Sequence, residues 1–191
     1  MNTCLPLILA SGSPRRKELL TLMGLAFEVD ISDADERFEG SPQEIVQELS
    51  RRKAAAVAAR HADSLVLAAD TIVYMGRVLG KPGTHERAQK MLRELSGQWH
   101  EVYTGMTLMD TSSGKILQRV ERTRVHFVEM TDQEICDYAA SGEPLDKAGA
   151  YAIQGQGGMF VDKIEGSHSN VIGLPMSALR QMLVQIGGAK D

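Results

Sequence analysis

Two adjacent arginines at the start of a predicted helix are the first residues of the chain that suggest chemistry. Arg15 and Arg16 follow Pro14, which suits the first position of a helix, and Ser13, whose hydroxyl can cap it. The free amides of a helix start favour a bound anion, and the arginines stand where the helix dipole would favour acidic residues. The pattern indicates an anion site. A plain serine cap followed by two solvated arginines is the alternative.

Three lysines extend this set of cations. Lys53 continues the line of Ile45 and Leu49 at four-residue spacing, so its ammonium group points where the apolar face of that helix points, unless it snorkels to the edge. Lys81 and Lys147 lie in predicted loops, where lysines are often simply solvated. Together with the two arginines they form a set of cations that suits a triphosphate ligand.

A carboxylate follows the most apolar strand of the sequence. Asp70 comes directly after the run 65–69, where an isolated charge costs several kcal/mol unless it is paired or bound to a metal. Ligands of open α/β sheets collect at the carboxyl ends of strands, which makes Asp70 a candidate catalytic or metal-binding residue. An aspartate that merely ends the strand as a turn residue is an equal alternative.

Alternating strands and helices must position these residues. Apolar patterning predicts strands over residues 5–10, 25–31, 65–69, 100–109 and 115–128. Helices are predicted over residues 14–23, 42–61, 84–95, 131–140 and 175–186. Hairpins are expected over 73–79 and through the turn 111–114, and two short strands after the glycine-rich stretch 142–158, whose residues 155–158 suggest a flexible turn. This order predicts an α/β protein with a mixed sheet.

Composition narrows the class of protein. The chain has 191 residues, 43% hydrophobic and 24% charged, which suits one large domain or two lobes around a cleft. Its net charge of −4 and its few aromatic residues argue against a nucleic-acid partner. No apolar stretch is long enough for a membrane span, and residues 1–3 do not begin a leader. Cys4 and Cys136 are expected to stay reduced, which favours the cytoplasm.

Several common catalytic motifs are missing from the sequence. It contains neither a Walker A loop nor a GxGxxG, HExxH, GxSxG or CxxC motif. The histidines are scattered at positions 61, 85, 100, 126 and 168, which argues against a histidine-rich zinc centre.

Six segments in order nevertheless match one family. They are SGSPRR (11–16), AADT (68–71), GKP (80–82), HEVYTG (100–105), DKAGAYAIQG (146–155) and NVIGLP (170–175). On the basis of these segments, which are spread along the sequence, the chain resembles the Maf family of nucleoside triphosphate pyrophosphatases over nearly its full length. The resemblance implies a single Maf-like domain over residues 1–191. It also implies a mixed, strongly twisted sheet with flanking helices, in two lobes around a central cleft, as in the inosine triphosphate pyrophosphatases.

The same resemblance assigns an activity and a set of residues. It implies hydrolysis of a nucleoside triphosphate between the α and β phosphates, with catalysis by Asp70, Glu36 and Lys53 and with Asp70 as proton acceptor. It places a divalent cation, Mg²⁺ or Mn²⁺, on Asp70 and Glu36. It assigns substrate binding to Ser11, Ser13, Arg15, Arg16, Thr71, Lys81, Lys147 and Gln154. Such a set is physically coherent, because phosphoryl transfer depends on charge neutralisation and positioning.

Three of these residues point to the substrate. Arg15, Thr71 and Gln154 stand where the dTTP/UTP subgroup of the family carries the same residue types. The side-chain amide of Gln154 offers one donor and one acceptor, which complement the O4 acceptor and the N3–H donor of thymine or uracil. Cytosine has a donor and an acceptor in the reverse order at these two positions. The resemblance therefore predicts hydrolysis of dTTP, UTP and modified pyrimidine nucleotides, as nucleotide-pool cleansing. A plain surface-turn role for Gln154 is the alternative.

A second class of function stays open at this point. The chain could be a non-catalytic nucleotide-binding regulator of cell division, since the resemblance also suggests a link to division arrest. Asp70, Lys53 and Glu36 favour the enzyme, with a small-molecule nucleotide as its substrate. A homodimer is expected from the resemblance alone.

Overall fold

The fold begins with a short strand that is buried on both faces. The strand β1 (Leu7–Leu9) consists of three apolar residues, each at most 2% exposed. It pairs in parallel with β2 (Glu28–Val29) and with β3 (Leu65–Tyr74).

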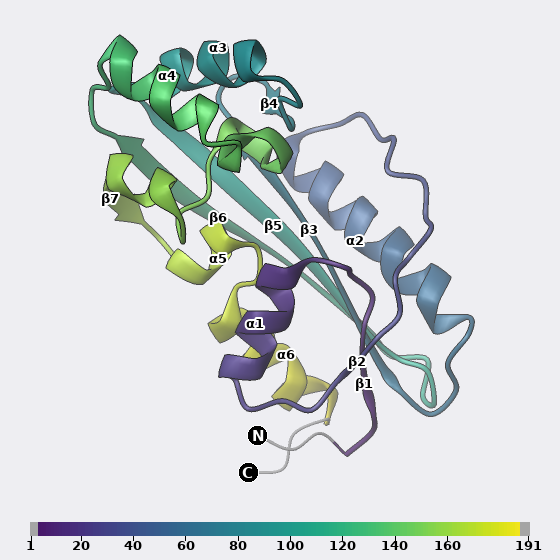
Figure 1. Cartoon of the computed structure of the whole chain (residues 1–191). Coiled ribbons are helices and arrows are strands. Elements are labelled where there is room, and N and C mark those ends of the chain that lie inside the picture. Colours follow the sequence, from purple (N-terminus) through teal and green to yellow (C-terminus); the bar gives the residue numbers. More distant parts are fainter. Residues whose placement is uncertain (1–3, 188–191) are drawn as a thin grey trace. The chain divides into compact units, whose positions relative to one another are not determined.

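The computed structural model describes residues 4–187 (Figure 1). Residues 1–3, on which the expectation about a leader rests, lie outside the described part, as do residues 188–191 of the expected domain.

Within residues 4–187, seven strands form one mixed sheet. The remaining strands are β4 (Val78–Leu79), β5 (Trp99–Asp110), β6 (Ile116–Phe127) and β7 (Val161–Glu165). The order is β2-β1-β3-β5-β6-β7, with β4 paired to β3. β4 is antiparallel to β3, and β7 is antiparallel to β6, whereas β1 is parallel to both of its neighbours. With helices flanking this sheet, the predicted mixed α/β class is confirmed.

The chain divides into two compact units. The first unit comprises the described residues through Asp70, then Thr104–Glu121 and the residues from Gly173 onward; the second comprises Thr71–Tyr103 and Arg122–Ile172. The first unit contains α1 (Pro14–Leu22), α2 (Pro42–Ala58) and α6 (Met176–Ile186). The second contains α3 (His85–Leu95), α4 (Asp132–Ala140) and α5 (His168–Ile172).

Close packing of α2 on the strands organises the first unit. Small residues make this possible: Ala54 of α2 and Ala68 of β3 are fully buried in one apolar cluster. A Cβ at Gly105 of β5 would lie 2.2 Å from the backbone oxygen of Val46, so only glycine permits this approach. Figure 1 shows α2 on one face of the strands, with α1 and α6 on the other.

An aromatic core organises the second unit. Phe127 is fully buried and packs edge-to-face on Tyr151 and His100, at ring-centroid distances of 4.8 and 5.2 Å. α3 and α4 pack against each other (Figure 1) and contribute Leu92 and Ile135 to the same core.

The predicted helices and hairpins are largely confirmed, but three expectations fail. The strand predicted over residues 65–69 continues to Tyr74, so Asp70 lies inside a strand and not at its end. The strand predicted over 25–31 is reduced to Glu28–Val29. After residue 158 the structure has a 3-10 helix through Phe160, the strand β7 and the short helix α5, where two strands were expected.

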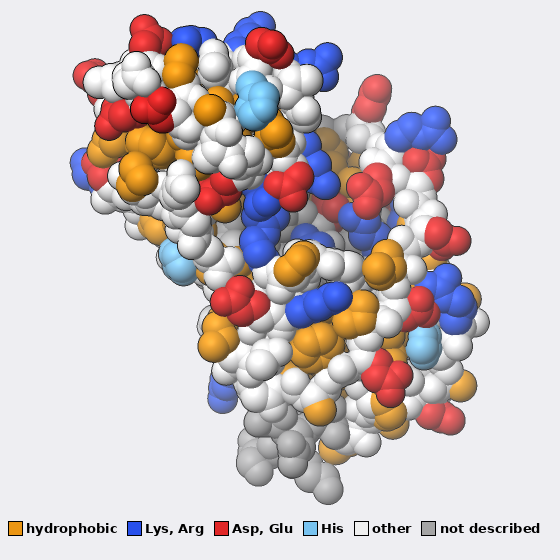
Figure 2. Space-filling view, viewed as in Figure 1, with side chains coloured by type: hydrophobic (Ala, Val, Ile, Leu, Met, Phe, Trp, Pro, Cys, Tyr) orange, Lys and Arg blue, Asp and Glu red, His pale blue; other side chains and the backbone are white. Residues whose placement is uncertain are grey.

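No helix within residues 4–187 combines the length and the apolar character that a bilayer span requires. Figure 2 shows Lys and Arg side chains interspersed with Asp and Glu over the face drawn.

The buried His100 gives a testable pH dependence of stability. Burial, with a smaller effect of His126, lowers the pKa of His100 from 6.5 to about 4. Because the unfolded chain binds this proton first, the free energy of unfolding should fall as the pH falls through 6.5 towards 4. Between pH 7 and 5.5 the loss from this group is about 1 kcal/mol.

Guanidinium chloride unfolding of the parent and of His100→Gln at both pH values checks this expectation. The variant is expected to be less stable at pH 7 but to lack this part of the pH dependence. Equal losses in the two proteins would contradict a neutral buried His100.

Candidate active site

A buried ion pair joins α2 to β3 in the first unit. Asp70 of β3 is 8% exposed, and the Lys53 ammonium of α2 donates to its Oδ1 at 2.6 Å. The Lys53 side chain is itself only 13% exposed. Removing one partner of such a pair leaves an uncompensated charge, which costs roughly 3–5 kcal/mol. Lys53 therefore explains how a carboxylate can lie inside an apolar strand.

A second carboxylate reaches the same ammonium group. Glu36, in the loop before α2, lies with Oε1 2.8 Å from Lys53 Nζ, while most of its side chain remains exposed. One buried cation is thus shared by an internal carboxylate and an external one. The alignment of Lys53 with the apolar face of α2, predicted from the sequence, is confirmed.

The start of α2 fixes where Lys53 stands. Ser41 and Glu44 form a capping box, in which Glu44 N donates to the Ser41 hydroxyl and Ser41 N donates to the Glu44 carboxylate. Pro42 occupies the first helical turn. Lys53 follows this cap by three turns, on the face that packs on the strands.

Arg16 lies in the same electrostatic environment. Its Nη1 donates to Ser11 Oγ at 3.0 Å and its Nε donates to the Gly173 carbonyl at 3.0 Å. Burial lowers the pKa of Arg16, while the Asp70 carboxylate opposes that effect. The structure therefore brings Arg16 together with Ser11 and with the Lys53–Asp70 pair.

The start of α1 differs from the prediction in one respect. Ser13 is the N-cap residue, but its hydroxyl makes no capping hydrogen bond. Its backbone N–H donates instead to Ser11 Oγ at 3.2 Å. The Ser11 hydroxyl thus holds the turn and Arg16 together. Arg15 occupies the first turn of α1 as predicted and is half-buried.

In the second unit, two loops carry the predicted lysines. Lys81 follows β4 and is exposed, whereas Lys147 follows the 3-10 helix Glu143–Asp146 and forms an ion pair with Asp146. Backbone hydrogen bonds join the two loops, from Gly149 to Gly80 at 3.3 Å and from Gly83 to Leu145 at 3.0 Å. These loops are therefore neighbours within the unit.

Thr71 lies in a strand and Gln154 lies in a turn. Thr71 follows Asp70 in β3 and is half-buried. Gln154 lies exposed in a turn closed by the hydrogen bond from Gly155 N to the Ala152 carbonyl, at 3.1 Å. The roles of Ser13, Arg15, Thr71 and Gln154 toward a ligand stay predictions.

One contact of the site was not assigned a role from the sequence. The Gly173 carbonyl, which accepts from Arg16, belongs to the segment 170–175 that contributed to the resemblance. Because the contact is made by a backbone carbonyl, no side-chain pattern in the sequence predicts it. The only local signal is the Gly-Leu-Pro sequence that precedes α6.

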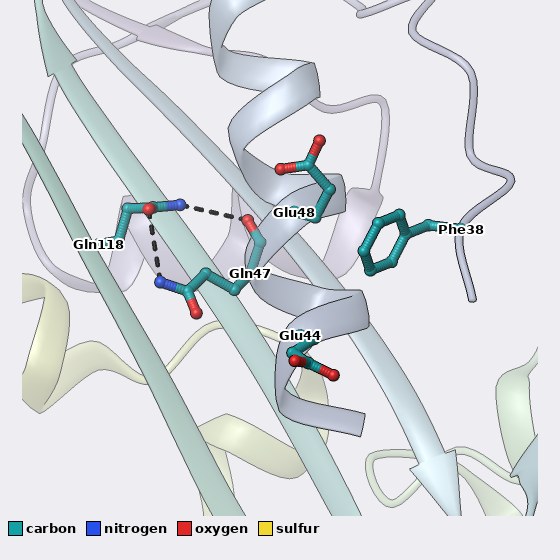
Figure 3. A pocket seen from close by; sticks show the side chains of 5 residues that line it. All are labelled: Phe38, Glu44, Gln47, Glu48 and Gln118. Carbon is teal, nitrogen blue, oxygen red and sulfur yellow. Dashed lines mark hydrogen bonds between the residues drawn. The ribbon is translucent and has the colours of Figure 1, made fainter. Parts of the chain in front are cut away.

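A pocket of about 260 Å³ lies elsewhere on the first unit (Figure 3), lined by Phe38, Glu44, Gln47, Glu48 and Gln118. Its carboxylates are already engaged: Glu44 caps α2, and Glu48 pairs with Arg51 and Arg52. Gln118 Nε2 donates to the Gln47 carbonyl at 3.2 Å. The pocket contains none of the predicted site residues.

The two carboxylates on Lys53 suit a divalent cation. Asp70 Oδ1 and Glu36 Oε1 face the ammonium, so the second oxygen of each carboxylate is outside these contacts. Mg²⁺ typically takes one or two carboxylates and completes its shell with phosphate oxygens and water. Among residues 4–187 there is no cluster of three or more His, Cys, Asp or Glu side chains placed for a metal. The donors therefore fit a cation that also uses substrate oxygens.

Curated relatives resemble the chain over most of its length. A protein of Bacillus cereus (strain AH820) is 50% identical over 182 residues, which cover 94% of both chains, and is named dTTP/UTP pyrophosphatase. A protein of Bacillus anthracis shares the same identity, coverage and name. A protein of Pelotomaculum thermopropionicum with that name is 48% identical, over 95% of this chain and 96% of its own.

A solved structure and a family model extend the comparison. A HAM1 protein from Coxiella burnetii superposes with a TM-score of 0.53 at 17% identity, over 95% of this chain and 99% of its own, which shows a shared fold. The model of the Maf-like protein family matches residues 6–186, which include every residue of the candidate site. With half of the residues identical to those of curated relatives over nearly the whole chain, this protein belongs to the Maf family.

Proposed function

We propose that this protein is a nucleoside triphosphate pyrophosphatase that hydrolyses dTTP and UTP to the monophosphate and pyrophosphate. The observation that carries the proposal is the Lys53 ammonium held between Asp70 and Glu36, because it pairs a buried carboxylate with a buried cation beside Arg16. Relatives that are about half identical and are named for this activity support it.

In the proposed reaction, Asp70 acts as the proton acceptor. A water molecule attacks one of the two phosphorus atoms of the α–β linkage, its proton passes to the Asp70 carboxylate, and the bond to the bridging oxygen breaks to release pyrophosphate. Lys53 orients the Asp70 carboxylate through the 2.6 Å contact. Glu36 is in a position to orient the water or to help hold a cation.

The cations of the chain are proposed to bind the phosphates. Arg16 suits this role because hydrogen bonds to Ser11 and to the Gly173 carbonyl hold its guanidinium group in place before a ligand arrives. Lys81 and Lys147, on joined loops, supply further positive charge, and the serines of the turn 11–13 supply hydroxyls.

A divalent cation, Mg²⁺ or Mn²⁺, is proposed to bind at Asp70 and Glu36. When bound, it would neutralise charge on the phosphate oxygens as pyrophosphate leaves.

Recognition of the base is proposed to rest on Gln154, with Arg15 and Thr71. A glutamine amide held in one orientation matches O4 and N3–H of thymine and uracil and opposes the reversed groups of cytosine. Because this edge is common to many pyrimidines, the enzyme would also accept modified nucleotides. We propose nucleotide-pool cleansing in the cytoplasm as its role; a homodimer and a link to cell division remain predictions.

Replacing Asp70 tests the catalytic assignment. Asp70→Asn keeps the shape of the side chain but removes the base, so pyrophosphate release from dTTP should fall by about 10²–10⁴-fold. Asp132→Asn, at an exposed aspartate that pairs with Arg93, is the matched control and should retain full activity. Undiminished turnover by Asp70→Asn would show that the assignment is wrong.

Tight dTTP binding without turnover by the parent would favour the non-catalytic regulator.

Replacing Gln154 tests base recognition. In Gln154→Ala, the ratio of kcat/KM for dTTP to that for CTP should fall by about tenfold or more, since the discriminating hydrogen bonds are lost. Gln156→Ala changes the same residue type two positions along the turn and should leave the ratio intact. Discrimination that survives in Gln154→Ala would refute a role in reading the base.

Metal removal tests the cation. EDTA is expected to abolish dTTP hydrolysis, and added Mg²⁺ or Mn²⁺ should restore it, because without the cation the carboxylates of Asp70 and Glu36 would repel the phosphate oxygens. Activity that persists in EDTA after extensive dialysis would argue against the proposed cation.

A further inference from the structure

A carboxylate of the second unit collects hydrogen bonds from one short loop. Glu143 Oε2 accepts from Gln156 N at 3.0 Å, and Glu143 Oε1 accepts from Gly157 N at 3.1 Å. The Tyr138 hydroxyl of α4 donates to Glu143 Oε1 at 2.7 Å. The Tyr138 hydroxyl thus holds the Glu143 carboxylate, and Glu143 in turn holds the backbone at Gln156 and Gly157.

Tyr138 also contacts that loop directly. Its hydroxyl oxygen accepts from the Ala152 backbone N–H at 3.3 Å. Tyr138 is 3% exposed and packs on Phe160, so its ring is fixed in the aromatic core. The two side chains therefore hold the loop at Ala152 on one side of Gln154 and at Gln156 and Gly157 on the other.

The glycines of this loop permit the close approach of Glu143 and Tyr138. A Cβ at Gly155 would lie 2.3 Å from Glu143 Oε2, and a Cβ at Gly157 would lie 2.4 Å from the Tyr138 hydroxyl. Where the sequence suggested a turn over residues 155–158, the structure has a 3-10 helix from Gln156 onward. These residues belong to a 3-10 segment, Gln156–Phe160 and its N-cap Gly155, fitted around Glu143 and Tyr138.

The electrostatics of the pair favour a permanent contact. Burial would raise the pKa of Glu143, but the hydrogen bonds from Tyr138, Gly157 and Gln156 outweigh it, and the pKa is lowered. Burial, together with Glu143, raises the pKa of Tyr138. At neutral pH an ionised acceptor thus faces a neutral donor, which gives a charge-assisted hydrogen bond.

We propose that Tyr138 and Glu143 are positioning residues that set the orientation of Gln154 and thereby the discrimination between dTTP or UTP and CTP. This inference rests on the proposed function. Gln154 is exposed, and reading a base edge requires an amide that stays in one place. The bonds on both sides of Gln154 supply that restraint. Glu143 also begins the 3-10 helix that leads to Lys147.

Tyr138→Phe removes only the hydroxyl and is the variant of choice. We expect the ratio of kcat/KM for dTTP to that for CTP to fall by about fivefold or more, mainly through a higher KM for dTTP, with kcat within about twofold. In a Gln154→Ala background, Tyr138→Phe should cause no further loss of discrimination, because the residue it positions is gone. Glu143→Gln should change the ratio in the same direction and serves as the second variant.

Tyr151→Phe is the matched control. Its hydroxyl lies 2.8 Å from His100 Nε2 in the same aromatic core, so the variant also loses one buried hydrogen bond, but one whose partner is His100 of β5 and not the loop. It should lower the thermal stability to a similar degree without changing the dTTP-to-CTP ratio. Hydrogen exchange adds a readout independent of activity: the amides of Gln156 and Gly157 should exchange faster in Tyr138→Phe than in Tyr151→Phe.

The outcomes separate the two proposals. A parent protein that hydrolyses dTTP, with an unchanged nucleotide ratio in Tyr138→Phe and Glu143→Gln, overturns the positioning role and leaves the proposed function standing. Equal ratio changes in Tyr138→Phe and Tyr151→Phe also overturn it, because they indicate a general structural effect. A parent protein that hydrolyses neither dTTP nor UTP overturns the proposed function, and the positioning role with it.

Discussion

The ion pair of Lys53 with Asp70 is the interaction on which the candidate site depends, because it gives a buried carboxylate a partner within an apolar strand. Its 2.6 Å contact exists only if α2 lies close against the strands. That approach depends on Gly105, where any side chain would meet the Val46 backbone, and on the alanines at the interface. Close packing at Gly105 and at these alanines thus sets the position of the Asp70 carboxylate.

The sequence predicts the elements around the site better than it predicts the position of Asp70. The prolines that begin α1 and α2 act through local backbone geometry, so the sequence predicts where these helices start. The four-residue spacing that ends in Lys53 is equally local, so the sequence also predicts which face of α2 carries this lysine. The end of β3 could not be predicted in the same way. A charged residue after an apolar run normally ends a strand, and only a partner distant in the sequence allows β3 to continue through Asp70 to Tyr74.

The glycine-rich loop illustrates a second limit of local reading. Glycines at 155 and 157 suggest mobility when they are considered alone, whereas in the structure they make room for Glu143 and Tyr138. In both units, a buried or half-buried carboxylate accepts hydrogen bonds that hold a neighbouring segment in place. In the first unit that segment carries Lys53, and in the second it carries Gln154.

Identification of the products of dTTP turnover by ³¹P NMR is the most direct test of this account. The account predicts that the three nucleotide phosphate signals give way to those of dTMP and inorganic pyrophosphate, in equal amounts, from the first time points onward. The appearance of dTDP and inorganic phosphate as the primary products would contradict it, because the bond broken would then be the terminal phosphoanhydride.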